Sequence, residues 1–270
     1  MRWPGGLRAL PPPLLALLLA GCSAGSGAGP GSTATEHLTV FAAASLQGVL
    51  DEVQAAYQAA HPGTTLTVST GSSAALGTQI ELGAPADVYL SADTANAQKL
   101  VADGFAAGSP VVFARNELTV IVPKDDPAGV TTPADLARPG VRIIAAGDAV
   151  PITKYANRLV ANLAALPGYP ADFAAAYAAN VASREDDVKA VLAKVELGEG
   201  DAGIVYVTDA AASSKVRTIR VPDAVNVPAT YAGAVVKGST HPDGARAFLD
   251  WFAGSGGQAI LARFGFLPPS

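Results

Sequence analysis

Short apolar runs alternate with longer amphipathic segments from Leu38 to the end of the chain. The runs are rich in Val and Ile and have the length of buried strands, whereas the amphipathic segments repeat their apolar positions with helical spacing. Strands are predicted at 38–42, 64–70, 87–90, 110–114, 117–123, 141–145, 202–207, 216–221 and 231–236. Helices are predicted at 46–60, 74–82, 94–102, 152–165, 188–197, 242–253 and 257–264. This order favours an α/β fold with mainly parallel sheets.

The predicted elements fall into two α/β units of similar size. A strand and two helices follow the second unit, so this unit is predicted to be inserted into the first. One lobe would comprise residues 37–117 and 231–270, and the other residues 118–230. The chain would cross between them near 118–122 and 227–235, which gives a two-lobed molecule with a hinge and a cleft between the lobes.

The first residues of the chain have the features of a lipoprotein signal peptide. Residues 1–21 contain two arginines and then a short apolar run, too short to span a membrane as a stable helix. The run ends in Leu-Ala-Gly before Cys22, which resembles a bacterial lipobox, and Cys22 is the only cysteine of the chain. Residues 22–36 are rich in Gly and Ser and are predicted to be a flexible tether. The protein is therefore expected outside the cytoplasm, anchored to the cell membrane by lipid on Cys22, although an ordinary signal peptide with an incidental cysteine is the alternative.

Composition and charge exclude several kinds of protein. The formal net charge is −5 and there is no basic cluster, which argues against nucleic-acid binding. A single cysteine excludes an internal disulfide and a zinc or redox pair of cysteines. Half of the residues are hydrophobic and only 15% are charged, so disorder is not expected. An acidic protein of this kind binds an anion only through a local site of neutral donors.

Candidate donors for such a site stand at the junctions between predicted strands and helices. In parallel α/β sheets, ligands bind beyond the carboxyl ends of the strands, where free N–H groups at helix N-termini attract anions. Each donor also has a simpler explanation, since a serine here is often only a helix cap, as Ser45 is predicted to be for the helix 46–60. Their distribution over both lobes is more informative than any one residue. The junction residues are Ser45, Ser72, Ser73, Pro151, Ile152, Val188 and Tyr206.

An enzyme is the main alternative class, and the sequence argues against it. There is no G-x-S-x-G elbow, and the three histidines His37, His61 and His241 fall in predicted linkers or at helix ends. No His, Asp and Glu residues gather at the spacing of a metal site. The acidic run Glu185 to Asp187 precedes a helix, where such residues favour the helix dipole. We expect neither catalysis nor a bound metal.

Four sequence motifs, in order along the chain, resemble the periplasmic molybdate-binding proteins, and together they span nearly the whole chain after the tether. They are Val-Phe-Ala-Ala-Ala-Ser-Leu at 40–46, Gly-Ser-Ser-Ala-Ala-Leu at 71–76 with its continuation to Val88, Gly-Ile-Val-Tyr-Val-Thr-Asp-Ala at 203–210, and Arg-Phe-Gly-Phe at 263–266.

This resemblance implies a two-lobed periplasmic-binding-protein-like fold of type II and a set of ligands for molybdate. Carried over residue by residue, the hydroxyl donors are Ser45, Ser73 and Tyr206, with Ser72 as the alternative to Ser73. The main-chain donors are Ile152 and Val188. The resemblance also implies a monomer that delivers molybdate to the membrane permease of an ABC importer and needs no cofactor.

Two departures from the family pattern affect these assignments. Ile152 and Thr153 stand where Ala-Gly is usual, which alters the rim of the pocket but keeps a main-chain N–H. The segment between Ile152 and Val188 is longer than usual, which weakens the assignment of Val188. A tungstate- or sulfate-selective protein of the same fold is the alternative. Iron is disfavoured because it usually takes paired tyrosines, and of Tyr57, Tyr177 and Tyr206 only the last ends a strand.

Overall fold

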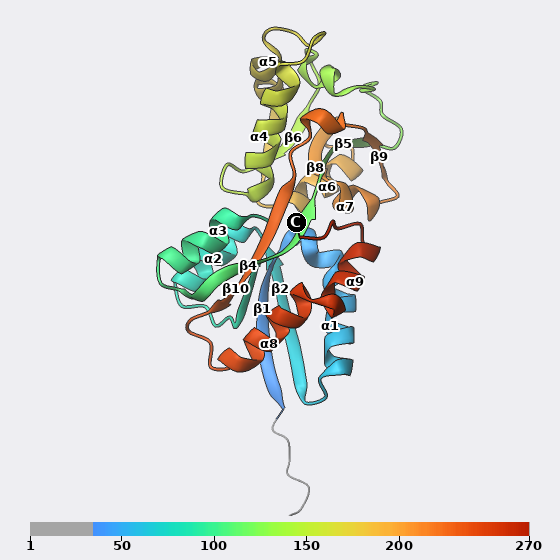
Figure 1. The fold of residues 1–270 in the computed structure, drawn as a ribbon. Helices are drawn as coiled ribbons and strands as arrows, with labels where there is room; N and C mark the ends of the chain where they lie inside the picture. Colours follow the sequence, from blue (N-terminus) through green and yellow to red (C-terminus); the bar gives the residue numbers. More distant parts are fainter. Residues whose placement is uncertain (1–34, 270) are drawn as a thin grey trace, which may run out of the picture. The chain divides into compact units, whose positions relative to one another are not determined.

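Two five-stranded sheets organise the part of the chain that the computed structural model describes, residues 35–269 (Figure 1). The first sheet has the strand order β2-β1-β3-β10-β4. Its strands are β1 (Glu36–Ala43), β2 (Thr64–Gly71), β3 (Val88–Ser91), β4 (Ala106–Asn116) and β10 (Ala229–Val236). The second sheet has the order β7-β6-β8-β5-β9. Its strands are β5 (Leu118–Pro123), β6 (Ile143–Ala146), β7 (Val181–Glu185), β8 (Ala202–Tyr206) and β9 (Val216–Ile219).

Both sheets are mixed, which corrects the prediction of mainly parallel sheets. In the first sheet β1 is parallel to β2 and β3, but β10 is antiparallel to β3 and β4. In the second, β6 is parallel to β7 and β8, but β5 is antiparallel to β8 and β9. The antiparallel strands β5 and β10 are those that follow a passage between sheets. The α/β, two-lobed fold predicted from the sequence is confirmed.

The chain passes between the two sheets twice. Glu117 alone separates β4 in the first sheet from β5 in the second. The return runs from the end of β9 to the start of β10, through the short 3-10 helix Asp223–Val225. Residue 36 already belongs to β1, so the first sheet begins within the segment predicted as tether. Cys22 and the predicted signal peptide lie outside the described residues.

Helices cover both faces of each sheet (Figure 1). On the first sheet, α1 (Gln47–Ala60), α8 (Pro242–Ala253) and α9 (Ser255–Arg263) lie on one face, and α2 (Ser73–Glu81) and α3 (Thr94–Ala102) on the other. On the second sheet, α4 (Pro151–Ala164) and α5 (Phe173–Ala179) lie opposite α6 (Val188–Glu196) and α7 (Val207–Ala211). Strand alternation divides the core accordingly, because Val40 and Ala42 pack with the residues of α1 while Phe41 packs with those of α2 and α3.

Among the α-helices and strands, three were missing from the sequence prediction: α5, β7 and α7. The strand β7 lies at an edge of the second sheet and has no fully buried residue, so its sequence Val-Ala-Ser-Arg-Glu carries no apolar pattern. The helix α5 is largely alanine, which gives little contrast between its two faces. Among the described residues, no helix has both the length and the hydrophobicity needed to cross a membrane.

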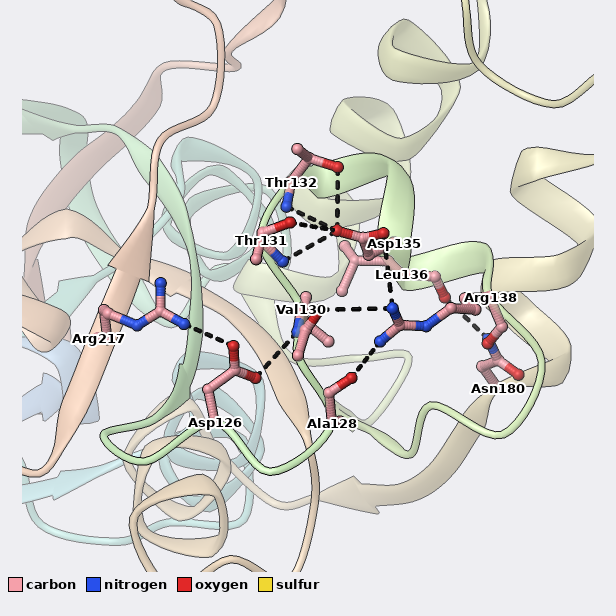
Figure 2. Close-up of polar contacts among 11 residues, drawn as sticks. Asp126, Ala128, Val130, Thr131, Thr132, Asp135, Leu136, Arg138, Asn180 and Arg217 are labelled. Atoms are coloured by element: carbon pink, nitrogen blue, oxygen red, sulfur yellow. Dashed lines mark hydrogen bonds and ion pairs between the residues drawn. The ribbon is translucent and has the colours of Figure 1, made fainter.

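The long segment between β5 and β6 is held by side chains that bond to the main chain (Figure 2). Asp135 accepts hydrogen bonds from the main-chain N–H and the hydroxyl of both Thr131 and Thr132. Asp126 accepts from the N–H of Val130 at 3.0 Å and pairs with Arg217 at 2.5 Å. The Asp135 bonds cap the 3-10 helix Pro133–Ala137, and together with the Asp126 contacts they fix the segment on the second sheet.

Candidate functional site

A small pocket forms where elements of both sheets converge at strand ends and helix starts. From the first sheet it is lined by the end of β1 and the residue after it, the end of β2, the start of α2 and the residue after β3. From the second it is lined by the starts of α4 and α6 and the end of β8. The lining residues are Ala43, Ala44, Gly71, Ser72, Ser73, Ala92, Val150, Pro151, Ile152, Asp187, Val188 and Tyr206.

The start of α2 presents two buried serines to this pocket. Ser72 precedes the helix, but its side chain makes no capping hydrogen bond. Ser73 is 1% exposed, and its Oγ accepts a hydrogen bond from the N–H of Ala92 at 3.0 Å. Because a main-chain N–H can only donate, the serine oxygen is the acceptor here. The hydroxyl proton of Ser73 is therefore left to be donated elsewhere.

The starts of α4 and α6 present main-chain N–H groups. Residues in the first turn of a helix have no intrahelical acceptor for these groups, and the helix dipole makes this end attractive to anions. Ile152 is the second residue of α4 and Val188 the first of α6. Within the described residues, neither N–H has a hydrogen-bond partner. Asp187 lines the pocket as well, but its carboxylate accepts from the N–H of Ala190 at 3.0 Å as the cap of α6.

Tyr206 contributes a buried hydroxyl that has no partner in the described part of the chain. The residue ends β8 and is 1% exposed. Its Oη makes no hydrogen bond. Burial raises the pKa of Tyr206 well above its usual value, with a further contribution from the neighbouring Tyr231. The hydroxyl therefore stays protonated at neutral pH and is a donor without an acceptor, which is costly unless a ligand supplies one.

Ser45 lies beside the pocket but is not among the residues that line it. It belongs to the 3-10 turn Ala44–Leu46 and makes no capping bond, so the prediction that it caps the first helix is wrong. Its Oγ accepts a hydrogen bond from the hydroxyl of Tyr231 at 3.0 Å. The structure thus brings Ser72, Ser73, Ile152, Val188 and Tyr206 to one pocket, with Ser45 adjacent to it through Ala44.

Sequence reasoning did not find the residues behind the pocket. Tyr231, Asn116, Asp209 and Lys189 are nearby in space but come from four different elements. Lys189 Nζ lies 2.7 Å from Asp209 Oδ1. The pocket itself is lined by no lysine or arginine, and in residues 35–269 no group of three or more His, Cys, Asp or Glu side chains is placed to hold a metal ion. Apart from Asp187, whose carboxylate caps α6, the polar groups of the pocket are neutral and include hydrogen-bond donors from Ser73, Tyr206, Ile152 and Val188.

The buried carboxyl of Asp209 gives the protein a testable dependence of stability on pH. Burial raises its pKa from 3.8 to about 6, and Lys189 opposes this rise. The folded chain therefore binds this proton more tightly than the unfolded chain. The stability that the proton contributes is complete below the unfolded pKa and is lost as the pH rises through the folded pKa.

We expect the unfolding free energy of the wild type to fall by about 2 kcal/mol, relative to that of Asp209→Asn, between about pH 4 and about pH 7. Urea denaturation of both proteins across this range is the measurement, and the difference cancels the titration of other groups. Parallel curves would mean that Asp209 titrates alike in the folded and unfolded chains.

Comparison with known proteins identifies relatives over almost the entire chain. A family model described as bacterial extracellular solute-binding protein matches residues 38–267. The molybdate-binding protein ModA of Mycobacterium tuberculosis is 35% identical over 274 residues, which cover 100% of both chains. YvgL of Bacillus subtilis, provisionally named an ABC transporter substrate-binding lipoprotein, is 32% identical over 93% of both chains.

A solved structure has the same fold. The periplasmic molybdate-binding protein of Azotobacter vinelandii superimposes with a TM-score of 0.70 and covers 86% of this chain and 100% of its own. Its sequence identity to this chain is 23%, so the likeness concerns the arrangement of helices and strands.

Proposed function

The chain belongs to the bacterial extracellular solute-binding proteins, and we propose that it captures molybdate outside the cytoplasm and delivers it to the permease of an ABC importer. Relatives that match over the full length carry the name molybdate-binding protein. In this role the chain is a carrier and not an enzyme, and molybdate is its cargo and not a cofactor.

The observation that carries this proposal is the polarity of the pocket. Ser73 uses its oxygen as an acceptor and keeps its proton free, and Tyr206 has a buried hydroxyl without an acceptor. Ile152 and Val188 offer unpartnered N–H groups at helix starts. A tetrahedral dianion with four acceptor oxygens and no proton complements such a set. Hydrogen bonds to a charged group contribute roughly 1.5–3 kcal/mol each, which offsets the cost of burying the anion.

The same polarity argues for discrimination against phosphate. A protonated phosphate needs an acceptor for its own hydrogen, and this pocket offers mainly donors. Tungstate and sulfate satisfy the donors as molybdate does, so only pocket size separates them. Tungstate- or sulfate-selective binding on the same fold is the second candidate.

Titration calorimetry tests the proposal with molybdate, tungstate, sulfate and phosphate. We expect tight binding of molybdate and tungstate, much weaker binding of sulfate and none of phosphate. Tight binding of sulfate would overturn the choice of ligand while keeping the binding role. No heat with any of the four anions would overturn oxyanion transport altogether.

Val188→Pro tests the main-chain donor at the start of α6. Proline has no N–H but is well tolerated at the first position of a helix, and the preceding Asp187 already has the extended backbone that proline requires. We expect the affinity for molybdate to fall about tenfold, the value of one charge-assisted bond, while the fold is kept. Calorimetry and the circular dichroism of the helices are the measurements.

Thr94→Pro is the matched control. Thr94 is the first residue of α3, whose cap Asp93 has the same extended backbone and likewise accepts from the third N–H of its helix. Thr94 does not line the pocket. Its variant is expected to bind molybdate as the wild type does, and equal losses in both variants would exclude Val188 as a specific donor.

Two further parts of the proposal concern position and movement. Cys22 carries the lipid anchor, which leaves the folded part just outside the membrane and within reach of the permease. Residues 37–117 with 231–270 form one lobe and 118–230 the other, and the chain at Glu117 and between β9 and β10 bends as the lobes close on the anion.

Cys22→Ala tests the lipid anchor. This variant is expected to be released from the membrane fraction, and its retention there would contradict the anchor.

A further inference from the structure

A series of hydrogen bonds connects Asn116, the last residue of β4, with Ser45 through Tyr231. We propose that Tyr231 is a positioning residue, which accepts a hydrogen bond from Asn116 and donates its own proton to Ser45, so that the hydroxyl proton of Ser45 is turned toward the bound oxyanion. This inference rests on the function proposed above.

The orientation of the Asn116 amide determines which group donates in each of these hydrogen bonds. The N–H of Glu117 lies 2.9 Å from Asn116 Oδ1, and since a main-chain N–H only donates, the amide oxygen must face it. The amide nitrogen then faces the other way, toward Thr208 Oγ1 at 2.8 Å and Tyr231 Oη at 3.5 Å. Asn116 is 1% exposed, so water does not compete for these bonds.

The hydroxyl of Tyr231 is an acceptor toward Asn116 and a donor toward Ser45. Its oxygen accepts a hydrogen bond from the Asn116 amide at 3.5 Å, and its O–H donates to Ser45 Oγ at 3.0 Å. The side chain of Tyr231 is completely buried, and burial raises its pKa well above the usual value. The phenol therefore stays protonated and can donate a hydrogen bond. Ser45 is therefore the acceptor of this bond.

The proton of Ser45 has no acceptor among the described residues. Ser45 follows Ala44, which lines the pocket, so an anion bound there would supply the acceptor. Ser73 is arranged in the same way, except that its oxygen accepts from the main-chain N–H of Ala92. Both serines are thus prepared as donors before the anion arrives, one by the main chain and the other by Tyr231.

Packing keeps the phenol in place. The ring of Tyr231 lies edge-on to Phe113 and Phe266, with centroids 6.0 and 5.5 Å away, and is tilted against Tyr206 at 5.7 Å. Removing only the hydroxyl leaves these contacts intact. It frees the Ser45 hydroxyl to rotate among its staggered positions, and this freedom must then be lost again when the anion binds.

The test compares Tyr231→Phe with Tyr57→Phe by calorimetry with molybdate on the full chain. Tyr57 is also buried, at 1% exposure, but packs against Phe248 and Trp251 away from the pocket. We expect Tyr231→Phe to weaken binding about fivefold to twentyfold, the value of about one hydrogen bond, and Tyr57→Phe to leave it unchanged.

A double-mutant cycle with Ser45→Ala separates positioning from a general structural role. Ser45→Ala alone should weaken binding about thirtyfold, and adding Tyr231→Phe should change the affinity by no more than about twofold, because Tyr231 acts through Ser45. Losses that multiply in the double variant would overturn the relay. If Tyr231→Phe bound molybdate with wild-type affinity, the positioning role of Tyr231 would be overturned and the proposed function would stand. If the wild type bound no oxyanion, both the positioning role and the proposed function would be overturned.

Discussion

Tyr206→Phe is expected to weaken molybdate binding roughly tenfold to a hundredfold and to stabilise the unliganded protein by about 1 kcal/mol. The two effects have opposite signs because the hydroxyl is buried without a partner in the described part of the chain. Without ligand, the unsatisfied hydroxyl costs free energy that phenylalanine does not. With ligand, the same hydroxyl donates a charge-assisted hydrogen bond that phenylalanine cannot make.

Tyr155→Phe is the matched comparison for this result. The rings of Tyr155 and Tyr206 are neighbours, with centroids 6.4 Å apart, but Tyr155 Oη accepts a hydrogen bond from the N–H of Thr230 at 3.3 Å. Removing this hydroxyl leaves the N–H of the half-buried Thr230 without its acceptor, so this variant should be less stable and nearly unchanged in affinity. Urea denaturation and calorimetry measure both quantities. A Tyr206→Phe protein of lower stability and normal affinity would contradict the role of the hydroxyl.

Gly257→Ala is expected to destabilise the protein by about 3 kcal/mol or more. A Cβ built on Gly257 in α9 would lie 2.0 Å from the main-chain oxygen of Phe252 in α8. A main-chain oxygen cannot rotate aside as a side chain does, so the two helices would have to separate. The buried side chains Phe248, Phe252 and Ile260 at their contact would lose part of their packing.

Gly48→Ala provides the control, since it makes the same substitution where there is room. Nothing lies within 4 Å of a Cβ at Gly48, which is inside α1. Alanine is favoured over glycine in a helix, so this variant should gain about 0.5–1 kcal/mol. Urea denaturation of both variants is decisive, and equal effects would exclude the close approach of α8 and α9 as the cause. Molybdate affinity should stay normal in both, because neither glycine lines the pocket.

The pocket that we propose for the dianion has no positively charged lining residue. Its donors are neutral, and the buried carboxyl Asp209 lies behind Tyr206 with Lys189 as its partner. In the proposed complex, the free N–H groups at the starts of α4 and α6 and the oriented hydroxyls would share the charge of the anion among several hydrogen bonds. Such a site depends on the geometry of each donor, which is why we expect single hydroxyl deletions to have measurable effects.

Sequence alone determined most of the elements and the positions of several donors. The alternation of strands and helices is a local pattern, and the start of a helix always leaves N–H groups free. Ser73, Ile152, Val188 and Tyr206 were therefore predictable as residues at strand–helix junctions, and the four line one pocket. The strand β7 was missed because an exposed edge strand carries no apolar pattern.

Only the tertiary structure decided which groups each donor meets. Ser45 looked like a helix cap from its neighbours in sequence, but its oxygen accepts from Tyr231, which lies 186 positions further along the chain. Asn116 meets Tyr231 because β4 and β10 pair side by side in the first sheet. Hydrogen-bond direction depends on such partners, and partners distant in the sequence leave no local signal. The sequence therefore located several hydroxyl and N–H groups at the strand–helix junctions, and the fold determined their hydrogen-bond partners.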